Sequence, residues 1–164
     1  MRWGKAVVVL GLVFLLSACG AELNPLFING DRAEPVIGWR ECPHAKHDGI
    51  TEVGLYEWDD SSTVDEPGEL LWHIKADRSL PLHRIRMGSA PEGFTTQRPL
   101  TATLDARSTY ALRTNMTSDD LVPGFLTFRP EQLSTGRVVF SDGRAESRRE
   151  YEGLDSEQFG CFTS

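Results

Sequence analysis

The sequence lacks the features that mark a nucleic-acid-binding protein. Only three of its seventeen basic residues are lysine, the formal net charge is −7, and the adjacent Arg148 and Arg149 are no more than a pair. No basic stripe interleaved with aromatic residues is present, and an acidic chain repels phosphate backbones. We therefore expect no nucleic-acid partner.

Recognisable catalytic motifs are also lacking. A nucleophile elbow, a two-histidine zinc helix, a phosphate-cradling glycine loop and a serine–lysine pair each have a characteristic spacing, and none occurs. His73 and His83 stand alone in strand-like segments, where a histidine is more often exposed or hydrogen-bonded than a catalytic base. The sequence predicts no enzyme and no cofactor, with an enzyme whose catalytic residues are scattered along the chain as the alternative.

The sequence has no apolar run long enough to cross a membrane. Its most apolar segment, residues 6–16, is eleven residues long and follows the basic residues Arg2 and Lys5. At about 1.5 Å per residue, such a helix is far shorter than the roughly 30 Å hydrocarbon core of a bilayer. This pattern is typical of a secretory signal.

Leu16, Ser17 and Ala18 then precede Cys19. This stretch resembles the lipobox of bacterial lipoprotein precursors. The resemblance implies cleavage after Ala18, a diacylglyceryl group on the Cys19 thiol, and a domain held at the extracytoplasmic face of the cell membrane. Two acyl chains give a stable anchor, since each buried methylene contributes about 0.8 kcal/mol. An ordinary signal peptide with an incidental Cys19 is the alternative.

The predicted organisation has three parts. Residues 1–18 form the signal peptide, and residues 19–40 form the lipidated N-terminus and a tether that becomes ordered near residues 36–39. Residues 41–164 form a single domain. The tether is predicted from two prolines, three glycines and the lack of a sustained period in residues 20–40.

Two cysteines remain if Cys19 carries lipid. An even count in an exported chain points to a disulfide, here between Cys42 and Cys161. Closing so long a loop stabilises a domain by roughly 4–5 kcal/mol in the chain-entropy model. Zinc held by Cys42, His44, His47 and Cys161 is the alternative, but an oxidising compartment favours the disulfide.

The domain itself shows short segments with period-two alternation, separated by turn residues. The clearest places Leu70, Trp72, Ile74 and Ala76 on one face. Asp142-Gly143 predicts a hairpin turn, and Pro130 predicts one helical turn over residues 129–133. The predicted strands are residues 50–58, 69–76, 82–88, 109–115, 124–128, 137–141 and 146–151. About seven strands predict an antiparallel β-sandwich of immunoglobulin-like architecture.

Several other residues are candidates for binding or packing. Soft ligands for copper are present as His83, Met87 and Met116, without a recognised spacing. Two acidic loops supply oxygen ligands for calcium, again without the spacing of a calcium loop. These loops contain Asp59, Asp60, Asp65 and Glu66, and Asp119 and Asp120. We therefore expect no bound metal.

Aromatic residues are expected to act as packing anchors. These are Trp58, Trp72, Tyr110, Phe125 and Phe140. Residues 89–94 are expected to form a turn with an exposed proline and aromatic ring, either a recognition loop or, as we favour, a packed corner.

Together these features predict a membrane-anchored, extracytoplasmic, noncatalytic module. Its expected partner is a protein, peptide or glycan at the cell envelope. A metal-binding lipoprotein is the alternative.

Overall fold

The protein is built almost entirely of β-strands. The computed structural model describes residues 26–40, 49–116, 124–140, 143–155 and 158. Two short helices accompany the strands: a 3-10 helix η1 (Pro130–Gln132) and α1 (Arg148–Gly153). The ten strands are β1 (Leu26–Asn29), β2 (Val36–Trp39), β3 (Ile50–Trp58), β4 (Leu70–Leu80), β5 (Arg84–Arg86), β6 (Thr95–Arg98), β7 (Thr109–Met116), β8 (Gly124–Phe128), β9 (Arg137–Phe140) and β10 (Arg144–Ser147).

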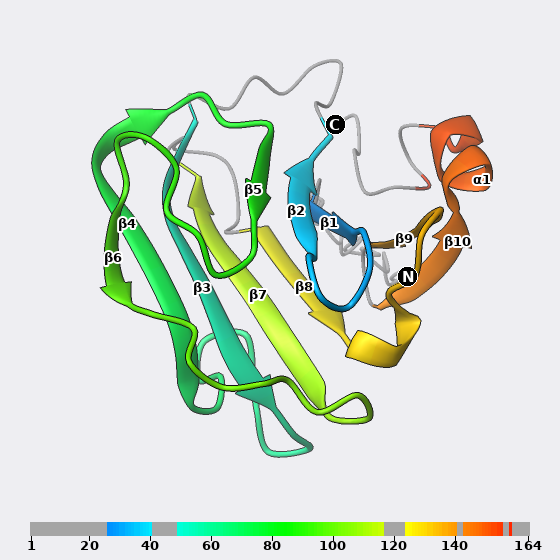
Figure 1. Ribbon diagram of the computed structural model, residues 1–164, viewed down its shortest axis with the longest axis horizontal. Coiled ribbons are helices and arrows are strands. Elements are labelled where there is room, and N and C mark those ends of the chain that lie inside the picture. The colour runs from blue at the N-terminus through cyan, green and yellow to red at the C-terminus, as the bar shows by residue number, and fades with distance from the viewer. Residues whose placement is uncertain (1–25, 41–48, 117–123, 141–142, 156–157, 159–164) are drawn as a thin grey trace, which may run out of the picture.

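These strands form two five-stranded antiparallel sheets (Figure 1). The first sheet has the order β10-β9-β1-β2-β5 and the second the order β8-β7-β3-β4-β6. Both sheets are therefore made in the same way. In the first sheet, the hairpins β1–β2 and β9–β10 pair through β1 and β9, and β5 pairs with β2. In the second sheet, the hairpins β3–β4 and β7–β8 pair through β3 and β7, and β6 pairs with β4.

One hydrophobic cluster joins the two sheets. Ile28, Ile37 and Val139 of the first sheet belong to the same buried cluster as Leu55 and Trp72 of the second. All five side chains have no exposed surface. The all-β, two-sheet antiparallel architecture expected from period-two alternation is confirmed.

All seven predicted segments contain strand structure, and two of them, Ile50–Trp58 and Gly124–Phe128, have the predicted bounds. The expected hairpin around Gly143 and the helical turn at Pro130 are also present. The expected strand number is too low, because β1, β2 and β6 bring the total in the described residues to ten.

The last predicted strand, residues 146–151, is wrong in its second half. Strand β10 ends at Ser147 and α1 begins at Arg148. The Ser147 hydroxyl accepts a hydrogen bond from the Glu150 N–H at 3.2 Å, and the Glu150 carboxylate accepts one from the Ser147 N–H at 3.0 Å. This capping box satisfies two N–H groups at the start of the helix and so favours the change from strand to helix.

The predicted tether also has to be shortened. Leu26–Asn29, assigned to the tether from its sequence, is the central strand of the first sheet, and all four of its residues are buried. Its side chains are covered on both faces, by the common core on one and by a second cluster on the other. A flexible segment can therefore extend no further than residue 25.

The second cluster lies on the outer face of the first sheet, beneath α1. The Tyr151 ring lies 5.4 Å from the Phe27 ring and 5.0 Å from the Phe140 ring, measured between centroids. The Arg40 guanidinium donates to the carbonyls of Tyr151 at 2.8 Å and Leu154 at 3.1 Å. These contacts fix the short helix against the sheet.

Candidate functional site

The described residues form an apolar pocket of about 490 Å³. We call it the apolar pocket. Three chain segments line it: the β1–β2 loop, the segment from Met87 to Ala106, and η1 with Leu133. Apart from Arg32 and Thr103, every lining residue is alanine, leucine, methionine or proline. Its size and lining are those of a pocket for a small apolar group.

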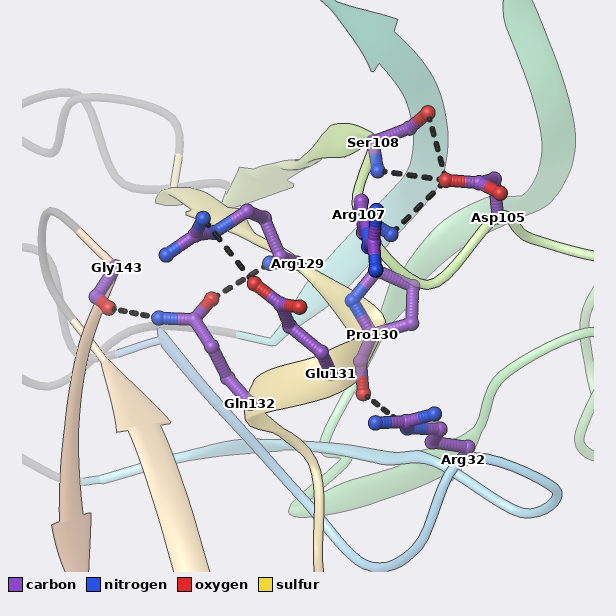
Figure 2. Close-up of polar contacts among 9 residues, drawn as sticks. All are labelled: Arg32, Asp105, Arg107, Ser108, Arg129, Pro130, Glu131, Gln132 and Gly143. Atoms are coloured by element: carbon purple, nitrogen blue, oxygen red, sulfur yellow. Dashed lines mark hydrogen bonds and ion pairs between the residues drawn. The ribbon is translucent and has the colours of Figure 1, made fainter.

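Hydrogen bonds join these three segments around the pocket, and Figure 2 shows the one between Arg32 and Pro130. The Arg32 side chain donates from Nε to the Pro130 carbonyl at 3.1 Å. The Glu131 N–H donates to the Ala106 carbonyl at 3.0 Å. The helical turn at Pro130 is thereby tied to both of the other segments, by one side-chain bond and one backbone bond.

Asp105 shapes the loop that forms one of these walls. Its carboxylate accepts hydrogen bonds from the N–H groups of Arg107 at 2.9 Å and Ser108 at 3.1 Å. The two bonds hold the pKa of Asp105 below its ordinary value. The Asp105 N–H in turn donates to the Tyr110 hydroxyl at 2.9 Å, which ties the loop to β7.

Gln132 fixes the other side of η1. Its side-chain oxygen accepts from the Arg129 N–H at 2.6 Å, and its side-chain nitrogen donates to the Gly143 carbonyl at 2.7 Å. Glu131 and Arg129 form an exposed ion pair at 3.1 Å beside them. The turn is therefore also anchored to the β9–β10 hairpin.

The chemistry available in the apolar pocket is that of binding. None of its lining residues is a histidine, cysteine, aspartate, glutamate or aromatic residue. The lining therefore offers contact area and one guanidinium, with no pair of groups that could exchange a proton.

A small polar cavity of about 160 Å³ lies on the outer face of the second sheet. At this cavity Glu52 lies 2.8 Å from His73 Nε2 and accepts from Asn115 Nδ2 at 3.2 Å. Burial raises the pKa of Tyr56 in the same cavity, while the nearby Arg113 opposes the rise. His73 is therefore placed at ion-pair distance from Glu52, while its Nε2 atom makes no hydrogen bond of acceptable geometry within the described residues.

The predicted lipidation and disulfide residues lie outside the described part of the chain. The predicted residues are Cys19, Cys42 and Cys161. The alternative zinc ligands His44 and His47 also lie outside this part of the chain. The acidic loop residues Asp119 and Asp120 and the side chain of Met116 lie outside it as well. For these residues the predictions made from the sequence stand untested.

Three of the remaining candidate metal ligands, Asp59, Met87 and His83, lie in separate parts of the structure. Asp59 accepts hydrogen bonds from the N–H and hydroxyl of Ser61, at 2.8 and 2.6 Å, and the hydroxyl bond is the main cause of its lowered pKa. Met87 is buried and lines the apolar pocket, whereas His83 is exposed and lines a different cavity. Among the described residues, no three histidine, cysteine or acidic side chains are grouped to hold a metal ion.

The aromatic residues pack as expected, whereas the turn at residues 89–94 differs from the expectation in its aromatic ring. Trp72, Tyr110 and Phe140 are buried, and Trp58 and Phe125 contact each other with ring centroids 5.1 Å apart. Phe94, expected to be exposed, is 9% exposed and belongs to the common core. This turn is therefore a packed corner.

Residues from separate segments make up the apolar pocket, and sequence reasoning missed it. The expected turn at Pro130 was the only local signal near it, since the chain around residues 99–106 has no alternation. No protein-family model, curated protein or solved structure matches the chain. Within the described residues, no helix is both long and apolar enough to span a bilayer.

Proposed function

We propose that the protein is a membrane-anchored extracytoplasmic lipoprotein that works as a noncatalytic binding module. The observation that carries the binding role is the apolar pocket, whose walls come from three segments held together by hydrogen bonds. An apolar side chain of a peptide or protein partner suits this pocket. A glycan suits it less, because sugars bind through aromatic faces and polar groups that its lining lacks.

The binding role is tested by filling the pocket. Ala102 lines it and is exposed, so Ala102→Trp should block the pocket without disturbing the core. The matched control is Ala90→Trp, at an exposed alanine outside the lining. We expect Nile red, a neutral apolar probe, to bind the wild type and the control with enhanced fluorescence, and to bind A102W at least fivefold more weakly. Equal binding by all three proteins contradicts the proposal.

The membrane anchor rests on the resemblance of residues 16–19 to a lipobox. Cys19→Ala should remove the thiol that carries the lipid, so the protein should leave the membrane fraction of the cell. A variant that stays membrane-bound and is processed as before would show that Cys19 is not the anchor. Ser17→Gly, which keeps a small residue before the cysteine, is the control that should remain anchored.

The disulfide between Cys42 and Cys161 is proposed as a clasp between the two ends of the domain. It predicts that the non-reduced protein has no free thiol at these positions, and that thiols appear after reduction. Free thiols in the non-reduced protein, masked by metal and exposed by a chelator, would instead support the zinc alternative.

We also propose an immunoglobulin-like architecture for the domain. Two antiparallel sheets around one core support it. The five-plus-five strand arrangement, with the first and last hairpins in one sheet, departs from the four-plus-three arrangement of constant-type immunoglobulin domains. The proposed likeness is therefore one of architecture, without the same strand order.

A further inference from the structure

A second cavity, of about 360 Å³, lies on the outer face of the first sheet beside α1. We call it the arginine cavity. Phe27, Asn29 and Val138, from the central strands β1 and β9, contribute to its lining, and Tyr151 of α1 forms part of a wall. It shares no lining residue with the apolar pocket.

The charge of this cavity is opposite to that of the chain. Arg40, Arg84 and Arg148 line it together with a single carboxylate, Glu152, although the chain as a whole has a net charge of −7. Arg40 is engaged with the carbonyl groups at the end of α1. Arg84 and Arg148, in contrast, make no ion pair or side-chain hydrogen bond within the described residues. Two guanidinium groups are therefore available to an anion.

Asn29 supplies the second observation. Its side chain lines the cavity, the residue is only 5% exposed, and its main chain pairs with β2 and β9. Within the part of the chain that the structure describes, the carboxamide has no hydrogen-bond partner. The carboxamide is not among the fully buried polar atoms that lack a partner in the described residues, so it is accessible from the cavity. The carboxamide offers both a donor and an acceptor to a molecule in the cavity.

We propose that the arginine cavity binds a small organic anion. The planar guanidinium groups of Arg84 and Arg148 suit a carboxylate or phosphate group, which both offer paired oxygen acceptors. Asn29 hydrogen-bonds a polar atom of the same molecule. The rings of Phe27 and Tyr151 contact its apolar part. The volume of the cavity limits the ligand to a molecule of about the size of a substituted sugar acid or a small aromatic acid.

Benzoate and its neutral analogue benzamide separate charge from shape in the test. In NMR titrations of the purified protein, we expect benzoate to shift the Asn29 side-chain resonances in a saturable way, and benzamide at the same concentration to leave them unchanged. Inorganic phosphate should compete with benzoate. Shifts of equal size for benzoate and benzamide would overturn the proposal, as would the absence of any benzoate binding.

Substitutions locate the site. R84Q/R148Q removes both available charges at exposed positions, and N29D places a like charge beside the bound anion. Each should weaken benzoate binding at least tenfold. The control is R98Q, whose guanidinium pairs with Glu69 at 2.6 Å on the second sheet, and it should bind as the wild type does. Should N29D fail to fold, R84Q/R148Q decides alone, and unchanged binding by that variant overturns the proposal.

A lipid headgroup would offer the same phosphate chemistry as a free anion. Sedimentation with phosphatidylglycerol vesicles, using the protein carrying Cys19→Ala to remove the proposed anchor, distinguishes the two sources. We expect no binding to vesicles by this variant while benzoate still binds. Vesicle binding that disappears in R84Q/R148Q, without benzoate or phosphate binding, would overturn the small-molecule assignment in favour of a membrane surface.

Discussion

Gly38 is the position at which a single methyl group should test how α1 is held to the sheet. Gly38 lies opposite Phe27 in the β1–β2 ladder, and a Cβ atom at Gly38 would overlap the Phe27 ring. That ring is buried between the sheet and Tyr151. In Gly38→Ala the ring therefore has to move, and with it the contact that packs α1.

The expected loss follows from two opposing effects. Forcing an extra carbon into a packed cluster costs about 1–3 kcal/mol. Replacing glycine by alanine at a position with ordinary backbone geometry restores about 0.4–1 kcal/mol by restricting the unfolded chain. We therefore expect Gly38→Ala to lower the free energy of unfolding by about 1–2 kcal/mol.

A double-mutant cycle identifies the cause of the loss. Phe27→Ala alone should cost about 3–5 kcal/mol, as is usual for a buried phenylalanine. With the ring gone, adding Gly38→Ala should be neutral or slightly stabilising. Urea unfolding followed by tryptophan fluorescence measures all four proteins. Gly153→Ala is the control, because a Cβ there meets no atom within 4 Å. If Gly38→Ala costs the same in both backgrounds, the collision with Phe27 is not its cause.

Three further predictions concern the polar contacts. Ser147→Ala should destabilise the protein by about 1 kcal/mol through loss of the helix cap. An NMR titration of this variant should show a raised pKa for Glu150, because the Ser147 hydroxyl is the main group that lowers this pKa in the wild type. Asp105→Asn should lower the melting temperature at neutral pH. The difference from the wild type should shrink as the pH falls through the depressed pKa of Asp105, because the carboxylate then becomes protonated. A difference in melting temperature that stays constant down to about pH 2 would contradict this. Arg40→Gln removes the bonds to the Tyr151 and Leu154 carbonyls, so hydrogen exchange of the α1 amides should become faster. The expected fall in the free energy of local opening is about 1–2 kcal/mol. Unchanged exchange would show that these bonds do not hold the helix.

Alternation predicted strands well wherever one face of a strand meets the core and the other meets solvent. Strand β4 shows this, since Trp72, Ile74 and Ala76 are buried and Lys75 is exposed. Strand β1 fails the same test because both of its faces are covered, so LFIN has no polar alternation. Strand β6 fails for the opposite reason: TTQR is exposed throughout and carries no apolar residue.

Helix α1 had a local signal that alternation obscured. Ser147 and Glu150 have the spacing of a capping box, which predicts the start of a helix. The ring of Tyr151, within the helix, contacts Phe27, which is far away in the sequence. The helix is stable in its place because of that tertiary contact, since six residues are too few to be helical alone.

Neither the apolar pocket nor the arginine cavity could be predicted from the sequence. Asn29, Arg84 and Arg148 come from three distant segments, and only the pairing of β1 with β2 and of β2 with β5 brings the first two together. Nothing in the residues near Asn29 indicates that its amide faces a cavity. Such sites depend on sheet register, which alternation alone does not determine.

The shared strand plan of the two sheets also has a consequence for how the chain reaches its native state. The second sheet is complete once residues up to Phe128 are available, whereas β1 must wait for β9, near the other end of the chain, before its second neighbour exists. Closing that long loop is entropically costly, and contacts between remote segments form slowly. During synthesis, the second sheet can therefore form early with its apolar face uncovered. That face is covered only when the final hairpin, β9–β10, has been added. This interval is when the protein is most prone to aggregation or to capture by a chaperone.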